Sequence, residues 1–437
     1  MLYYSTHDPR HMVTLREAVL QGVSPDGGLY MPHAIRPLPR AFFENMSGMS
    51  LQDMSYAVIN HLAQGDIPSQ VLHRVVYAAF DFDIPLVHTC DNRFVLELFH
   101  GPTMACKDLG ARFMGMMIGH YKALNTNSPT INVLVPTSGD TGSAVANGFL
   151  GIPKVRVFVL YPKGQINLIQ LVQFATLGQN VTALEVNGTF DDCKSLIAQS
   201  LTDEELNRQL VVTSGTSINI ARILPQTVYY FWALAQLQRQ GIDTGNVVVS
   251  VPCSNLGNLT SGLIAQAMGL PIKRFLSVEN DNNIFYNYVK TGIFSPRPSK
   301  TSIAPALDSG NPTNFGRVQD LLGTLDNIRN HVHAYSYHDG QIIDTMRAVY
   351  RRENYLLDPH SAVAYQALLD DLQPGETGIS LATAHSVKWK ETVERIIGQE
   401  LTIPSQLARF LAGNLQVKPM NSGFTSFKRY LMREAKG

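Results

Sequence analysis

The chain has 437 residues, 45% of them hydrophobic and 16% charged, which is typical of a globular protein with two or three domains. Lysine plus arginine and aspartate plus glutamate number 35 each, so the net charge favours neither nucleic acid nor an anionic membrane as a partner. The four cysteines are scattered without CxxC spacing, which indicates reduced thiols in a cytoplasmic protein and predicts neither a disulfide framework nor a metal site.

The first 82 residues are predicted to form a helical amino-terminal domain. They begin MLYYSTHDPRHM, which contains an acid and no long apolar core, so we expect neither a secretory nor a transit peptide. Thr14 and Glu17 have the spacing of a capping box, and QVLHRVVYAAF (70–80) repeats apolar residues at helical intervals. No apolar run anywhere in the sequence is long enough to span a bilayer.

From residue 83 onward, short runs rich in β-branched residues alternate with helical patterns such as TGSAVANGFL and LTSGLIAQAMG. This alternation predicts βαβ units, and therefore an α/β fold whose parallel sheets are covered by helices on both faces. A stretch rich in Pro, Ser and Gly (295–314) is expected to be a long ordered loop or the edge of a lid. The expected strands are 131–136, 155–162, 181–187, 247–252, 273–278 and 378–382.

Polar turns, most of them with glycine, follow four of these strands, at the edge where open parallel sheets bind ligands. They are TSGDTG (137–142), YPKG (161–164), CSNLGN (253–258) and the pair Thr383 and His385. Backbone N–H groups at the start of a helix can bind an anion, but Thr, Ser and Asp also cap helices, so TSGDTG alone favours neither interpretation. Because no Walker lysine or magnesium-binding set follows, a small phosphate ester fits these loops better than ATP.

Lys107 has an unusual setting within ELFHGPTMACKDLGARF (97–113). A lysine normally lies in solvent, because burying an unpaired ammonium costs several kcal/mol or more. In this apolar segment the side chain either extends outward or is kept neutral for covalent chemistry. A lysine of the second kind, together with a phosphate-binding loop of backbone amides, points to pyridoxal phosphate (PLP) held as a Schiff base.

Several segments together resemble the threonine synthases of the fold-type-II PLP-dependent family, and they occur in the same order. The resemblance implies that fold, with a helical amino-terminal domain (1–82), a large cofactor-binding domain (83–126 and 211–437) and a small substrate-closing domain (127–210). The matching segments are SPDGGLYMP (24–32), HGPTMACKD (100–108), TSGDTGSA (137–144), SINIARILPQ (217–226), SNLGNLTSG (254–262), DPHSAVAY (358–365) and LATAHSVKWKE (381–391).

The resemblance also implies roles for individual residues. Lys107 matches the catalytic lysine that carries the cofactor, Asp140 the residue near the 3′-hydroxyl, and Thr383 the hydroxyl facing the pyridine nitrogen. The loop 254–259 matches the one that holds the cofactor phosphate, and 137–142 the one that receives the substrate carboxylate. The expected cofactor-binding residues are Lys107, Asp140, Ser254, Asn255, Leu256, Gly257, Asn258, Leu259 and Thr383. The expected substrate-binding residues are Thr137, Ser138, Gly139, Thr141, Lys163, Asn219 and Arg222.

The activity implied is conversion of O-phospho-L-homoserine and water to L-threonine and phosphate, by γ-elimination and β-hydration, as the last step of threonine biosynthesis. A cytoplasmic monomer or small homo-oligomer without nucleic-acid or membrane partners is expected, with Lys163, Arg222 and Arg112 as candidates for the substrate phosphate. Two alternatives stay open: a PLP phospholyase acting on another phosphorylated amino compound, and a catalytically silent ligand-binding relative. The second arises because Ser254 stands where the family usually has glycine.

Overall fold

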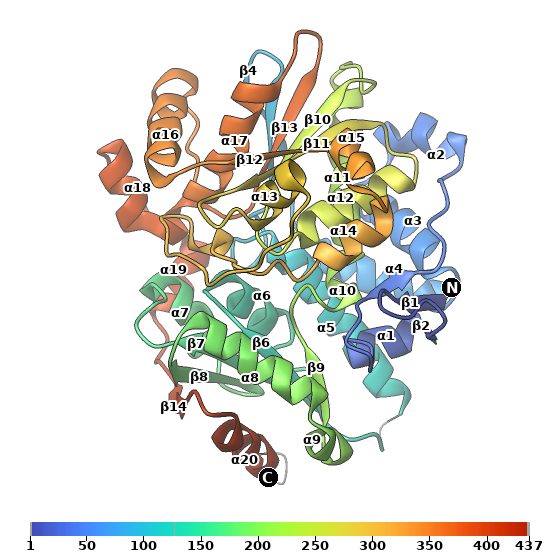
Figure 1. The fold of residues 1–437 in the computed structure, drawn as a ribbon, viewed down its shortest axis with the longest axis vertical. Helices are drawn as coiled ribbons and strands as arrows, with labels where there is room; N and C mark the ends of the chain where they lie inside the picture. Colours follow the sequence, from blue (N-terminus) through green and yellow to red (C-terminus); the bar gives the residue numbers. More distant parts are fainter. Residues whose placement is uncertain (1, 126, 435–437) are drawn as a thin grey trace.

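Two α/β sheets carry most of the fold in the computed structural model, which describes residues 2–125 and 127–434 (Figure 1). Neighbouring strands are parallel in both sheets, except that β4 pairs antiparallel with β5 at one edge. The larger sheet contains, in order, β12 (Val332–Ser336), β11 (Ile272–Glu279), β10 (Val247–Pro252), β13 (Thr377–Ala382), β5 (Arg93–Glu97) and β4 (Leu86–Cys90). The smaller contains β14 (Val417–Asn421), β8 (Val181–Asn187), β7 (Val155–Pro162), β6 (Ile131–Pro136) and β9 (Val211–Ser214).

All six strands expected from the sequence are present, and most of the residues in each are buried, on both faces of the sheet. In the smaller sheet, Val133 and Val135 pack with α6 (Asp140–Gly148) and α7 (Leu168–Ala175), whereas Leu134 packs with α8 (Phe190–Thr202). Successive side chains point to opposite faces of a strand, so both faces are apolar and covered by helices. A short helix, α9 (Glu204–Gln209), leads into β9.

The larger sheet is covered in the same way. Val247 and Val249 pack on the side of α11 (Gln226–Arg239) and α12 (Gly257–Ala267), and Val248 packs on the side of α16 (Asp339–Glu353) and α17 (Pro359–Asp371). The remaining helices of this unit are α5 (Lys107–Leu124), α10 (Ile220–Ile223), α13 (Ile284–Thr291), α14 (Phe315–Leu322), α15 (Leu325–His331) and α18 (Lys390–Ile397). Among the described residues, no helix is both long and apolar enough to cross a membrane.

The amino-terminal region holds the expected helices and also a small sheet that the sequence did not predict. The capping box is confirmed: the Thr14 hydroxyl accepts from the Glu17 N–H at 3.2 Å, and the Thr14 N–H donates to the Glu17 carboxylate at 2.8 Å. The helices are α1 (Leu15–Gln21), α2 (Arg40–Asn45), α3 (Leu51–Ala63) and α4 (Ser69–Ala79), with a 3-10 turn at η1 (Met46–Gly48). The antiparallel strands β1 (Leu2–Ser5), β2 (Met12–Thr14) and β3 (Tyr30–Pro32) are too short to show an alternating pattern, so the region predicted as helical also contains a sheet that the sequence did not indicate.

The smaller α/β unit is built from two separated parts of the chain. Residues 211–214 (β9) and 417–421 (β14), which the expected division places in the large domain, pair with β6 and β8 of the smaller sheet. After α19 (Ser405–Leu411) the chain returns to this unit, and α20 (Phe424–Glu434) packs beside α8 (Figure 1). The carboxyl-terminal segment therefore belongs structurally with the smaller sheet.

Residues 295–314 form a long ordered loop, as expected, with one 3-10 turn at η2 (Pro305–Leu307). The Asn282 side chain anchors this loop at Lys300. The Asn282 amide donates to the Lys300 carbonyl at 2.8 Å, and the Asn282 side-chain oxygen accepts from the Lys300 N–H at 2.7 Å. Such hydrogen bonds order a segment that has no secondary structure of its own.

Candidate active site

The segment that contains Lys107 lies against the exit of β13. The Cys106 N–H donates to the Thr383 carbonyl at 2.8 Å, and Ala105 forms an antiparallel bridge with Ala384. Thr383 is thus brought next to the residue that precedes Lys107, which agrees with the resemblance that assigns both residues to one cofactor site. Lys107 itself is the first residue of α5 and is half-buried.

The turn before Lys107 is fixed by the buried carboxylate of Asp108. It accepts from the Thr103 N–H at 2.8 Å and from the Thr103 hydroxyl at 2.6 Å. Burial raises the pKa of Asp108, although the Thr103 hydrogen bonds act in the opposite direction. Gly101 is required beside it, because a Cβ there would lie 2.6 Å from a carboxylate oxygen of Asp108. The start of α5 is therefore held in one geometry before any ligand binds.

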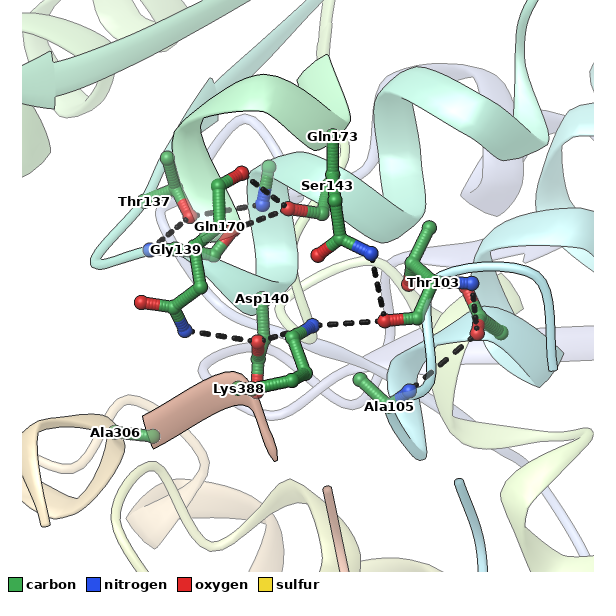
Figure 2. Close-up of polar contacts among 12 residues, drawn as sticks. Thr103, Ala105, Thr137, Gly139, Asp140, Ser143, Gln170, Gln173, Ala306 and Lys388 are labelled. Carbon is green, nitrogen blue, oxygen red and sulfur yellow. Dashed lines mark hydrogen bonds and ion pairs between the residues drawn. The ribbon is translucent and has the colours of Figure 1, made fainter. Parts of the chain in front are cut away.

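Asp140 lies at the centre of a buried polar network (Figure 2). Its Oδ1 accepts from the Gln170 amide at 2.9 Å and forms an ion pair with the Lys388 Nζ at 2.6 Å. Lys388 also donates to the Thr103 carbonyl at 2.8 Å, as does the Gln173 amide at 3.0 Å. The network joins the turn before Lys107 to the exit of β6 and to α7.

The charge of Asp140 is set by these neighbours. Burial alone raises the pKa of this carboxyl, but the nearby ammonium groups of Lys388 and Lys107 and the hydrogen bonds from Lys388 and Gln170 outweigh it and lower the pKa to about 2. Asp140 is therefore ionised at neutral pH. Because Lys107 contributes to this effect, Asp140 and Lys107 interact electrostatically.

Five residues of this network are absent from the set that the sequence indicates: Thr103, Asp108, Gln170, Gln173 and Lys388. Lys388 falls inside the last matched segment, between Val387 and Trp389, in the 3-10 turn η3 (Ser386–Trp389). The one sequence feature that could have indicated a buried Lys388 is that apolar residues flank it on both sides. The glutamines gave none, because a polar residue on an amphipathic helix ordinarily faces solvent.

The loop 137–142 forms a tight turn at the start of α6. The Thr137 hydroxyl accepts from the N–H groups of Gly139 at 2.9 Å and Gly142 at 2.8 Å. Gly139 has a φ of +134°, and a Cβ at this position would lie 2.4 Å from the Gln170 side chain. Ser138 and Thr141 are half-buried, and neither hydroxyl bonds to another described residue. Two free hydroxyls at a helix start can receive a carboxylate.

The loop 254–259 offers a row of unused backbone donors. None of the N–H groups of residues 254–259 donates a hydrogen bond within the described part of the chain, and they lie at the start of α12. The Asn314 amide holds the loop through the Asn255 carbonyl at 2.8 Å. Unpartnered amides at the positive end of a helix dipole fit a phosphate group, so these residues suit a phosphorylated cofactor. The Asn258 side chain bonds outside this loop, since its oxygen accepts from the Tyr230 hydroxyl at 2.8 Å.

Ser254 does not need the conformation that glycine would supply. Among the described non-glycine residues with positive φ, the one in this loop is Leu256, at +58°, and Ser254 is not in that region. The serine therefore introduces no backbone strain, and its half-buried hydroxyl adds a donor next to the unused amides.

The expected substrate-binding cations are not gathered together. Arg222 is buried and donates to the carbonyls of Gly215 at 2.7 Å and Lys107 at 3.2 Å, and burial lowers its pKa to about 10. Lys163 is exposed at the end of β7, and Arg112 pairs with Asp81 at 2.7 Å. Asn219 serves as the N-cap of α10. Of these side chains, Arg222 reaches the main chain of Lys107.

Family models agree with this arrangement along nearly the whole chain. A model described as pyridoxal-phosphate dependent enzyme matches residues 88–383, one described as threonine synthase N terminus matches 2–80, and one described as threonine synthase, C-terminal matches 361–430.

Relatives and solved structures match over their full length. Threonine synthase of Haemophilus influenzae is 39% identical over 99% of this chain and 100% of its own, and that of Escherichia coli is 37% identical over 99% of both. The crystal structure of threonine synthase from Escherichia coli has a TM-score of 0.93 at 37% identity, covering 99% of this chain and 100% of its own. PLP-bound threonine synthase from Brucella melitensis has a TM-score of 0.92 at 29% identity, covering 100% of both chains.

Proposed function

Since the chain belongs to the threonine synthase family of PLP-dependent enzymes, we propose how its own residues carry out the conversion of O-phospho-L-homoserine and water to L-threonine and phosphate. Lys107 would bind the cofactor covalently, and the amides of residues 254–259 would hold its phosphate. The unused amides at the start of α12 are the observation that carries this assignment. When bound, PLP withdraws electrons from the substrate and makes its Cα and Cβ protons removable.

The Lys107 amine has the central chemical role in this proposal. With substrate bound, the Lys107 amine would accept the substrate Cα proton and move protons at Cβ and Cγ, while phosphate leaves from Cγ and water adds at Cβ. Asp108 and Thr103 keep the amine in place by fixing the start of α5. Thr383, brought next to Cys106, is assigned to the pyridine nitrogen.

The substrate carboxylate is assigned to the loop 137–142, where the hydroxyls of Ser138 and Thr141 and the first turn of α6 are available. For the substrate phosphate, Lys163 and Arg112 stay predictions, and Asn219 stays a prediction for substrate binding. The hydrogen bonds of Arg222 to two main-chain carbonyls favour a role in holding the backbone of Lys107 in place.

We further propose a cytoplasmic location and a monomer or small homo-oligomer with a small-molecule substrate. All four cysteines are free thiols, which suits a reducing compartment.

The substrate is tested by measuring phosphate release and threonine formation from O-phospho-L-homoserine and, in parallel, from O-phosphoserine. We expect phosphate and threonine in equal amounts from the first compound, and at least about a hundredfold lower kcat/KM for phosphate release from the second, because productive geometry depends on chain length. Faster release from O-phosphoserine would instead favour a phospholyase of different substrate class. A protein without a visible cofactor band would support the catalytically silent alternative.

Ser254→Gly is expected to weaken PLP binding about three- to tenfold, because it removes one hydroxyl donor, worth about 1 kcal/mol, from the phosphate loop. The dissociation constant is measured by titrating the apoprotein with PLP and following fluorescence. Ser254→Ala is the matched control, since it also removes the hydroxyl but keeps the Cβ, and it should give the same loss. Tighter binding of PLP by the glycine variant would show that the loop prefers a more flexible residue at this position.

A further inference from the structure

Lys388 is the most completely buried charge near Lys107. Its side chain has 0% exposure, and that of its partner Asp140 has 3%. Its Nζ contacts Asp140 Oδ1 at 2.6 Å and the Thr103 carbonyl at 2.8 Å (Figure 2). These two contacts join the exit of β6, in the smaller α/β unit, to the turn before α5 in the larger one.

A buried ion pair of this kind is a poor way to gain stability. Removing two charges from water costs several kcal/mol for each ion, and apolar side chains of the same volume are often at least as stable. A pair kept at such a position therefore calls for a role beyond holding the fold. Lys388 also bonds to the Thr103 carbonyl, in the turn that leads into α5, whose first residue is Lys107, and Asp140 interacts electrostatically with Lys107, so the role acts at the start of α5.

We propose that Lys388 is a positioning residue that cancels the negative charge of Asp140 beside Lys107, so that the cofactor-linked nitrogen of Lys107 faces an ion pair of zero net charge. This inference rests on the proposed function, in which Lys107 carries PLP. Without Lys388, the nitrogen would face a lone carboxylate and hold its proton more tightly. Without Asp140, it would face a lone ammonium and lose the proton more easily.

Other titratable groups surround the pair and do not replace it. The Cys106 thiol interacts electrostatically with Lys107 and Asp140. The Asp108 carboxyl and the His385 imidazole both interact with Lys388. Burial raises the pKa of the Cys106 thiol and of the Asp108 carboxyl, and it lowers that of the His385 imidazole, so each moves toward its neutral form. The Arg222 guanidinium stays charged at neutral pH beside the Lys107 carbonyl and is the same in every variant, so differences in charge beside Lys107 come from Asp140 and Lys388.

The test is a spectroscopic pH titration of the holoenzyme, with Lys388→Met, Asp140→Asn and the double variant. We expect the pH midpoint of the visible cofactor band to move up by about one unit in Lys388→Met and down by about one unit in Asp140→Asn. In the double variant it should return to within about 0.3 unit of the wild-type value, because the summed charge at positions 140 and 388 is again zero, as in the wild type. A merely structural bridge would not produce shifts of opposite sign.

The matched control is Lys390→Met, two residues after Lys388. It breaks the ion pair between Lys390 and Glu394 and should leave the pH midpoint of the cofactor band unchanged. Urea unfolding gives an independent measurement: the single variant Lys388→Met should unfold at a lower urea concentration than the double variant, because it leaves Asp140 buried and unpaired. Shifts of the same sign in both single variants, or no shift in either, would overturn the inference. Failure of the proposed function would differ, since the wild-type protein would then show no visible band to titrate.

Discussion

Lys107→Ala is expected to lower kcat for threonine formation by about a thousandfold or more, because under the proposed assignment the variant loses both the covalent attachment of the cofactor and the amine that moves the protons. The absorption band of the lysine-bound cofactor should disappear with it. The fold should survive, since the Lys107 side chain forms no hydrogen bond with a described residue and is half-buried. Absorbance spectra and single-turnover assays on the purified variant provide the measurements.

Lys122→Ala is the appropriate control for this experiment, because Lys122 is the other lysine of α5. Its Nζ donates to the Ser128 carbonyl at 3.0 Å, so its loss costs some stability but should leave the cofactor band intact. If the Lys107 variant retained both its band and its turnover, a different lysine would carry the cofactor, and the assignment of the site would be wrong.

Arg317→Met is expected to cost about 4 kcal/mol or more of unfolding free energy, because it leaves several buried acceptors without donors. Arg317 is fully buried and donates to the carbonyls of Tyr30 at 3.0 Å, Ser217 at 2.8 Å and Ile218 at 2.8 Å, and to the Asn314 side chain at 2.6 Å. One guanidinium thus ties the amino-terminal region to the loop before α10. Urea denaturation of wild-type and variant protein measures the cost.

The same substitution should also weaken PLP binding, because Arg317 holds Asn314, which in turn holds the Asn255 carbonyl in the loop proposed to bind the cofactor phosphate. Arg329→Met is the matched control: Arg329 likewise donates to main-chain carbonyls, those of Val289 at 2.8 Å and Lys290 at 3.0 Å, but its side chain is 41% exposed. We expect it to cost about 1 kcal/mol or less and to leave cofactor affinity unchanged. Equal losses in the two variants would mean that Arg317 has no special part in joining these regions.

Features that depend on neighbouring residues could be predicted from the sequence. The capping box at Thr14 and the buried strands β6, β7, β8 and β10 are local patterns, and they appear with the expected boundaries. That Thr383 and Lys107 serve one site was implied by the resemblance alone, and the structure brings Thr383 next to Cys106 because β13 and β5 are parallel neighbours.

What could not be predicted involves partners that are distant in the sequence. The pairing of Lys388 with Asp140 joins separate α/β units, and no local periodicity connects them. Arg317 lies in FGRVQDLL, an amphipathic helix pattern in which an arginine ordinarily faces solvent, yet it is fully buried. The strand β14 gave no signal either, because VKPMN is short, polar at two positions and contains a proline.

The place of β14 in the smaller sheet has a consequence for how the chain matures during translation. β8 leaves the ribosome long before β14, its parallel neighbour, has been synthesised. Until then, one side of β8 carries unsatisfied main-chain groups that can pair with another nascent chain. The interval between the two strands is therefore a period of aggregation risk, and it ends when residues 417–421 close that edge.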